Sequence, residues 1–308
     1  MTVTPLDILL LKGGPSAERE VSLVTGAACT QALRSLGHRV TAYELTRDLG
    51  ALCKALTPKP DVVFNSLHGH YGEDGCIQGI LDLLEVRYTH SGVLASAMAM
   101  DKPLAKRLFT SAGMLVPEGQ IAGLEDFRDG DPMPRPYVVK PLAEGSSVGV
   151  TIVREHDNPP PMTTETWNYG EEALLERYIG GRELTVSVLG NRPLTVTELR
   201  PKVGFYDYEA KYTEGKTEHL IPAAVHPQIF QKALNWALKA HRLLGCNGVT
   251  RADYRYDDAD GEPGDLYLLE INTQPGMTPL SLVPEQARHL GMSFPALCQW
   301  IVEEALSR

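Results

Sequence analysis

Residues 266–276 read Leu266-Tyr267-Leu268-Leu269-Glu270-Ile271-Asn272-Thr273-Gln274-Pro275-Gly276. Side chains alternate between the two faces of a strand, so Glu270 and Asn272 point to one face while Ile271 points into a core. The strand must end at Pro275-Gly276, where the chain turns. A carboxylate beside a carboxamide supplies the hard oxygen ligands that Mg²⁺ prefers. Two solvated polar residues at a strand end would give the same pattern.

A second stretch, residues 249–256, brings a third oxygen ligand to this face. It predicts a strand with Arg251 and Asp253 on one side, and residues 258–261 predict a turn into the first stretch. Asp253 would then lie beside Glu270. Neighbouring carboxylates repel each other unless a cation or a shared proton lies between them. Because Mg²⁺ usually binds carboxylates together with phosphates, a nucleotide is the expected ligand.

Phosphate would have to be held without a P-loop, because the sequence contains no G-x-x-x-x-G-K-[ST]. Lys140 ends a predicted strand over residues 136–141 and precedes the loop Glu144-Gly145-Ser146-Ser147. Exposed backbone N–H groups and a lysine suit phosphate oxygens.

Two other motifs suggest different chemistry. Residues 145–149 match the G-x-S-x-G of serine hydrolases, but that motif must lead into a helix, whereas residues 148–153 are β-branched and predict a strand. His68 and His70, followed by Glu73 and Asp74, could bind a transition metal, although the surrounding glycines favour a turn.

Composition limits the function classes. The 308 residues carry a net charge of −10, which disfavours binding to nucleic acid or to an anionic membrane. The five cysteines are widely spaced, which indicates a reducing compartment rather than a disulfide framework or a zinc site. No signal peptide and no run of 18 apolar residues is apparent, so we expect a soluble cytoplasmic protein.

The order of predicted elements indicates an α/β protein. Residues 7–11, 40–45 and 61–65 predict strands around a helix over residues 21–36, which is typical of a doubly wound parallel sheet. The middle and C-terminal parts are richer in strands and predict an α+β arrangement. We place domains at residues 1–101, 102–181 and 182–308, with a long functional loop at about 203–222.

Seven motifs, in order along nearly the whole chain, resemble those of the D-alanine–D-alanine ligase family of the ATP-grasp superfamily. They are Gly13-Gly14-Pro15-Ser16-Ala17-Glu18-Arg19-Glu20-Val21-Ser22, His68-Gly69-His70-Tyr71-Gly72-Glu73-Asp74-Gly75, Met100-Asp101-Lys102, Val139-Lys140-Pro141 with residues 144–149, Tyr206-Asp207-Tyr208-Glu209-Ala210-Lys211-Tyr212, Arg251-Ala252-Asp253, and Glu270-Ile271-Asn272-Thr273-Gln274-Pro275-Gly276-Met277. The resemblance implies that the second and third domains form an ATP-grasp fold. It also implies the ligation of two D-alanine molecules through a D-alanyl phosphate, for peptidoglycan precursors.

The resemblance further implies a nucleotide site and a metal site. Two Mg²⁺ ions, with Mn²⁺ able to replace them, would be held by Asp253, Glu270 and Asn272. The residues implied for ATP are Lys102 and Lys140 at the α- and β-phosphates, Glu144 in the phosphate loop, Lys211 at the γ-phosphate, Glu176 at the adenine amino group with the backbone of Arg177 and Ile179 beside it, Glu183 at the ribose, and Phe205 and Leu269 as apolar walls.

For the two amino acids, the resemblance assigns another set of side chains. Glu18 would bind the ammonium of the first D-alanine, and His68 would lie beside that substrate. Arg251 and the Gly276 N–H would stabilise the tetrahedral oxyanion. The remaining assignments are Ser281 and the Leu282 backbone at the second carboxylate, and Ser146 and Tyr212 in a hydrogen-bonded set with Glu18 that closes the loop over the site. A homodimer is also implied.

Three other functions remain to be distinguished. A D-alanine–D-lactate ligase or another ATP-grasp carboxylate–amine ligase would share most of these motifs, although Tyr212 favours the amide-forming enzyme. A nucleotide-binding regulatory module would not need an oxyanion donor such as Arg251. A serine hydrolase would use Ser147 as its nucleophile.

Overall fold

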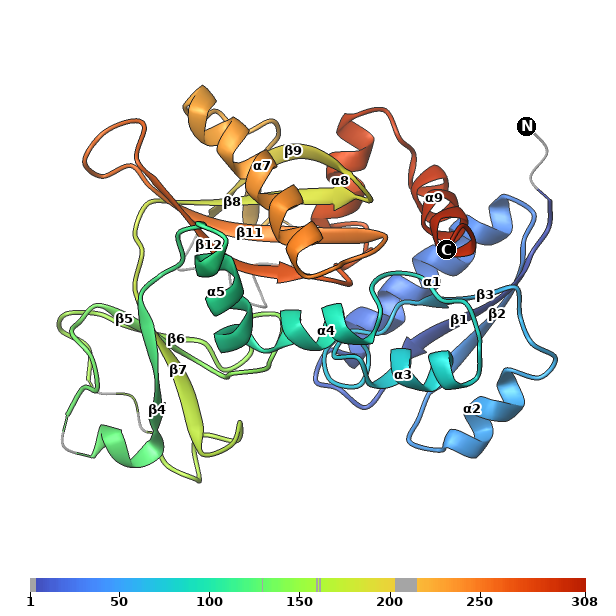
Figure 1. The fold of residues 1–308 in the computed structure, drawn as a ribbon, viewed down its shortest axis with the longest axis horizontal. Coiled ribbons are helices and arrows are strands. Elements are labelled where there is room, and N and C mark those ends of the chain that lie inside the picture. The colour runs from blue at the N-terminus through green and yellow to red at the C-terminus, as the bar shows by residue number, and fades with distance from the viewer. Residues whose placement is uncertain (1–3, 129, 159, 161, 203–214) are drawn as a thin grey trace.

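A computed structural model describes the chain except for residues 1–3, 129, 159, 161 and 203–214. Within the described residues the strands form three sheets, which lie in separate parts of the molecule (Figure 1). The mixed α/β fold agrees with the predicted class.

The first sheet is parallel and has the order β2-β1-β3. Strands β1 and β3 are mainly apolar and buried, because helices and the C-terminal part of the chain cover them, whereas β2 buries only Val40 and Leu45. The strands and helices of this part are β1 (Asp7–Gly13), α1 (Arg19–Ser35), β2 (Arg39–Leu45), α2 (Leu49–Ala55), β3 (Val62–Asn65), α3 (Cys76–Leu83) and α4 (Val93–Met100).

The second sheet is antiparallel and has the order β4-β7-β5-β6. Its elements are β4 (Gly119–Gly123), the 3₁₀ helix η1 (Leu124–Phe127), β5 (Tyr137–Lys140), β6 (Thr151–Val153) and β7 (Glu172–Arg177). The strand expected from residue 148 begins only at Thr151. The preceding loop turns through left-handed backbone at Ser146 and Ser147, with φ of 49° and 60°, and left-handed backbone cannot continue a strand.

The third sheet carries the hairpin predicted from the sequence. Its order is β10-β9-β8-β11-β12, with all neighbours antiparallel. The strands are β8 (Arg182–Leu189), β9 (Arg192–Pro201), β10 (Thr217–Leu220), β11 (Val249–Asp257) and β12 (Asp265–Asn272). Our expectation of an uninterrupted loop over 203–222 was wrong at its C-terminal end, because β10 pairs there with β9.

Helices α7 (Pro227–Leu243) and α5 (Lys102–Ser111) both pack against the third sheet. Helix α7 buries Ala233, Ala237 and Ala240 against it. Helix α5 follows the first sheet but packs its Phe109 into that same core.

The C-terminal helices are α8 (Leu282–His289) and α9 (Phe294–Leu306). Helix α9 returns to the first sheet and packs against α1 (Figure 1). Among the described residues, no helix combines the length and apolar character needed to cross a membrane.

Candidate active site

The hairpin of β11 and β12 gathers the three predicted oxygen ligands on one face. Asp253 pairs directly with Glu270, and Arg251 pairs with Asn272. Cα atoms of directly opposed residues in antiparallel strands lie about 4.5–5.5 Å apart. A β-bulge follows at Asp253/Tyr254, after the ligands have been set in register.

Asp253 is the centre of a hydrogen-bonded cluster. Arg251 donates Nε to one carboxylate oxygen at 2.8 Å and Nη2 to the other at 2.7 Å. Thr185 Oγ1 donates at 2.7 Å, and Asn272 Nδ2 donates at 2.9 Å. Because Asn272 turns its amide nitrogen to Asp253, its carbonyl oxygen is left for another ligand. Lys102 Nζ lies 3.9 Å from Glu270 Oε2.

This donor set fits a hard divalent cation. Two carboxylates and one carboxamide oxygen share a face, and hard oxygen donors of this kind suit Mg²⁺ in company with phosphate. The alternative metal site at His68 and His70 has no such support. Within the described part of the chain, no three His, Cys, Asp or Glu side chains form a metal-binding group.

Glu270 lines two cavities that meet at the hairpin. One has a volume of about 430 Å³ and runs between the second and third sheets. The other holds about 40 Å³ and lies between the first and third sheets. The two cavities therefore adjoin at the Glu270 side chain.

The larger cavity contains all the described residues that were predicted for ATP. Its lining includes Lys102, Lys140, Glu144, Glu176, Arg177, Ile179, Glu183, Leu269 and Asp253. Lys102 Nζ donates to the Glu144 carbonyl, and Lys140 Nζ lies 2.5 Å from Glu176 Oε2. Phe205 and Lys211, predicted for the same nucleotide, fall outside the described residues, as does Tyr212.

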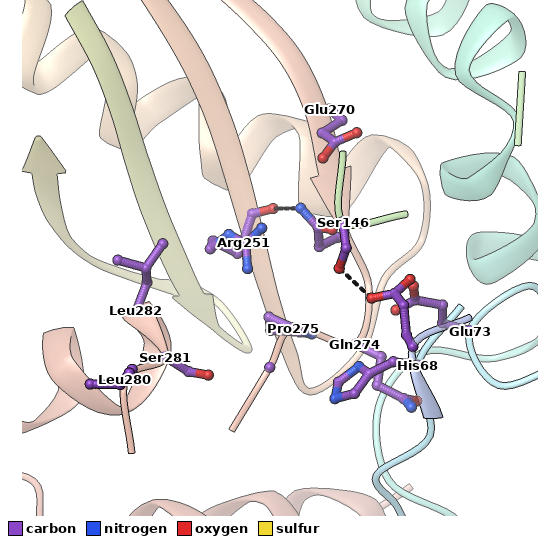
Figure 2. Close-up of a pocket in the computed structure, with 13 residues that line it drawn as sticks. His68, Glu73, Ser146, Arg251, Glu270, Gln274, Pro275, Leu280, Ser281 and Leu282 are labelled. Carbon is purple, nitrogen blue, oxygen red and sulfur yellow. Dashed lines mark hydrogen bonds between the residues drawn. The ribbon is translucent and has the colours of Figure 1, made fainter. Parts of the chain in front are cut away.

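The smaller cavity contains the residues predicted for the amino acids. Figure 2 shows His68, Glu73 and Ser146 on one side, Leu280, Ser281 and Leu282 on the other, and Arg251 and Pro275 between them. Ser146 Oγ donates to Glu18, as predicted. Ser281 begins α8 and accepts a hydrogen bond from the Thr278 N–H at 2.9 Å. Asn272 and Gly276 also line this cavity.

Burial shifts the pKa of two groups in the smaller cavity. Desolvation lowers the pKa of His68 to about 4, so the imidazole is neutral at pH 7. Desolvation together with the Glu18 carboxylate raises the pKa of Glu73 to about 8, so that carboxyl group is largely protonated. The cavity thus holds less negative charge than its acidic side chains would suggest.

Two residues of the site, Gln274 and Lys106, were not predicted, and Glu73 was predicted only as a possible metal ligand. Glu73 and Gln274 line the smaller cavity, and Lys106 contacts Glu176 from behind the larger one. Glu73 and Gln274 stood inside quoted motifs, so their positions were a usable signal. Lys106 lies on α5, and nothing in the local sequence relates it to β7.

The hydrolase interpretation fails on geometry. Ser147 lies in a turn that leads to strand β6 and not to a helix. A nucleophile elbow requires a strand-to-helix turn.

Comparison with known proteins agrees with this geometry. A sequence profile described as "D-ala D-ala ligase C-terminus" matches residues 131–303, and one described as "D-ala D-ala ligase N-terminus" matches residues 49–91. The D-alanine–D-alanine ligase of Granulibacter bethesdensis is 55% identical over 301 residues, which cover 98% of each chain. That of Rhizobium meliloti is 52% identical over 97% of each chain.

A solved structure has the same fold. The D-alanine–D-alanine ligase of Bacillus anthracis, complexed with ATP, superimposes with a TM-score of 0.82 at 29% sequence identity. The alignment covers 99% of this chain and 98% of that one.

Proposed function

The chain belongs to the D-alanine–D-alanine ligase family, and from that premise we propose that it joins two D-alanine molecules in an ATP-dependent reaction. The reaction is ATP + 2 D-alanine → D-alanyl-D-alanine + ADP + phosphate. The product is a building block for the peptidoglycan of the cell wall.

In the first step a carboxylate oxygen of one D-alanine attacks the γ-phosphorus of ATP, and the bond from that phosphorus to the β,γ-bridging oxygen breaks to release ADP. Glu18 holds the ammonium of this D-alanine, and Ser146 orients Glu18 through its hydrogen bond. Neutral His68 lies beside the reacting carboxylate without adding charge.

In the second step the amine of the other D-alanine attacks the acyl carbon. Arg251 and the Gly276 N–H stabilise the oxyanion of the tetrahedral intermediate. The carbon–oxygen bond to phosphate then breaks, the attacking nitrogen gives up one proton to the departing phosphate, and the amide remains. Ser281 and the Leu282 backbone hold the carboxylate of this second substrate at the start of α8.

The nucleotide occupies the larger cavity. Lys102 and Lys140 contact the α- and β-phosphates, Lys211 the γ-phosphate, Glu176 the adenine amino group and Glu183 the ribose. Asp253, Glu270 and Asn272 would hold Mg²⁺, or Mn²⁺, which offsets the charge that develops on the phosphates. Tyr212 would join Ser146 and Glu18 when the loop closes and excludes water.

One observation carries this proposal: Glu270 separates a cavity suited to a nucleotide from one suited to an amino acid. That placement supports the transfer of a phosphoryl group from one to the other. We further propose that the protein is cytoplasmic, as its cysteine content indicates, and that it is a homodimer, as the family resemblance implies.

Phosphate release tests the function. The purified protein with ATP and Mg²⁺ should release phosphate when D-alanine is present and should form D-alanyl-D-alanine in equal amount. L-alanine should give no release, and D-lactate added to D-alanine should give no ester. Release that does not depend on D-alanine would refute the proposal, and ester formation would favour the D-alanine–D-lactate ligase.

A further inference from the structure

Lys106 is a buried lysine without a role in the proposed reaction. Its side chain, on α5, is 9% exposed. Its Nζ donates to the Pro117 carbonyl at 2.7 Å and to Glu176 Oε1. Lys106 is not among the described residues that line the larger cavity, whereas Glu176 and Pro117 are. It therefore contacts the nucleotide cavity only through its partners.

Each oxygen of the Glu176 carboxylate contacts a different lysine. Lys106 binds Oε1 from behind, and Lys140 approaches Oε2 to 2.5 Å from the cavity side. Burial alone would raise the pKa of Glu176, but Lys140 and Lys106 together lower it below its ordinary value. Glu176 is 2% exposed, so water contributes little to keeping it ionised.

The two lysines differ in what a nucleotide would do to them. Lys140 lines the cavity and is proposed to contact phosphate, which would compete with Glu176 for its ammonium. Lys106 has no such competitor, because its other partner is a backbone carbonyl. In the nucleotide complex, Lys106 is thus the cation that stays with Glu176.

We propose that Lys106 is a positioning residue that keeps the Glu176 carboxylate ionised and fixed, and so sets the preference for a 6-aminopurine nucleotide. An ionised carboxylate only accepts hydrogen bonds, so it pairs with the amino group of adenine and repels the 6-oxo group of hypoxanthine. A protonated carboxyl group can donate as well, and would accept either base. This inference rests on the proposed placement of adenine at Glu176.

The test compares ATP with ITP, which differ at position 6 of the purine. Lys106→Met should raise the KM for ATP about tenfold, as for loss of a charged hydrogen bond. It should also lower the ATP/ITP ratio of kcat/KM by about tenfold, while the KM values for D-alanine stay unchanged. Lys106→Arg keeps the charge and should retain most of the ratio. Lys239→Met is the matched control, because Lys239 also donates to a backbone carbonyl, that of Ala112, but forms no ion pair with a carboxylate among the described residues.

The Glu176→Gln variant separates the possible failures. If Lys106 acts through Glu176, the double variant should resemble Glu176→Gln alone rather than combine both losses. Additive losses, or a Lys106→Met enzyme with the parental ATP/ITP ratio, would overturn the proposal. If Glu176→Gln also leaves the ATP/ITP ratio of kcat/KM unchanged, the proposed placement of adenine at Glu176 is wrong as well. If thermal melting shows that Lys106→Met is unfolded, Lys106→Gln replaces it in the same measurements, because glutamine can still donate a hydrogen bond to the Pro117 carbonyl.

Discussion

At the scale of single residues, Gly276 leaves room for a neighbour as well as offering its N–H. A Cβ atom built on Gly276 would lie 2.9 Å from Ser281 Oγ. That hydroxyl is tied to the Thr278 N–H at 2.9 Å, so it cannot move away without losing a hydrogen bond. Gly276→Ala should therefore displace Ser281 and raise the KM for the second D-alanine by about tenfold, the cost of roughly one hydrogen bond.

Initial-rate kinetics that resolve the two D-alanine sites measure this effect. The KM for the first D-alanine and for ATP should stay near the parental values, because Glu18 is bonded to Ser146, across the smaller cavity from Ser281, and Ser281 does not line the larger cavity. Gly79→Ala is the matched control, since its Cβ would meet Val93 at an ordinary 3.8 Å. A Gly276→Ala enzyme that loses the first site rather than the second would contradict the assignment of Ser281.

The metal-ligand candidates were predictable at this scale, and the buried partners were not. Glu270 and Asn272 follow from the period of a strand, and Asp253 follows once a hairpin is recognised, which the register bears out. Lys106 meets Glu176 across 70 residues of sequence. Such a contact depends on how α5 packs against the sheets, and no local pattern encodes that.

At the scale of elements, Arg255 holds the linker between β7 and β8, residues 178–181, by hydrogen bonds. It donates Nε to the Ile179 carbonyl at 3.1 Å and Nη2 to the Gly181 carbonyl at 2.9 Å, and Nη1 lies 3.4 Å from Glu183. This linker lines the larger cavity. Arg255→Met should loosen this linker and raise the KM for ATP about fivefold. The substitution removes two or three partly exposed hydrogen bonds, worth about 0.5–1.5 kcal/mol each, and water replaces some of them.

Steady-state kinetics at varied ATP check the linker, with D-alanine held at saturation. The kcat should stay within about twofold, because Arg255 touches no reacting group in the proposed mechanism. Arg34→Met is the control, since Arg34 donates to the Val40 carbonyl at 2.6 Å in the first sheet and should leave the ATP kinetics unchanged. An unaltered KM for ATP in Arg255→Met would show that the linker does not need this guanidinium.

Elements with a strong apolar pattern were predicted, and the edge strands β4 and β10 were not. The buried strands β1 and β3 and the helix α1 carry clear apolar patterns. Strand β4 is mostly exposed, and β10 is a four-residue strand at the edge of its sheet. Edge strands of this kind are defined by the neighbour they pair with, so their own sequence gives little signal.

At the scale of the whole molecule, the cores do not follow the order of the chain. Phe109, which precedes the second sheet in sequence, packs into the core of the third. Cys298 and Ile301 of α9 pack with Leu33 of α1 in the core of the first. Sequence patterns can show that a helix has an apolar face. They could not say which sheet each apolar face would cover, because any of several cores offers similar burial.

Buried histidines make the stability of the whole molecule sensitive to acid. Burial lowers the pKa of His68 and His241 to about 4 and that of His90 to about 3, from an ordinary 6.5. Below pH 6.5 these histidines bind protons in the unfolded chain but stay neutral in the folded chain. The free energy of unfolding therefore falls as the pH drops from 6.5 towards 4. Each histidine contributes a slope of up to about 1.4 kcal/mol per pH unit. Glu73 has the opposite effect, because its pKa is raised to about 8 in the folded chain. Its contribution to the free energy of unfolding falls as the pH rises from about 4.5 to 8.

His241→Gln measures the contribution of one of these histidines. His241 is buried on α7, is hydrogen-bonded to Thr250 and lines neither of the two cavities. Urea unfolding at several values between pH 7 and pH 4.5 should give a free energy of unfolding that falls less steeply than in the parent, by up to about 1.4 kcal/mol per pH unit. The difference in slope is independent of any constant loss from the substitution itself. The exposed His289 supplies the control, and His289→Gln should keep the parental slope. Equal slopes in His241→Gln and the parent would mean that His241 takes up its proton in the folded state.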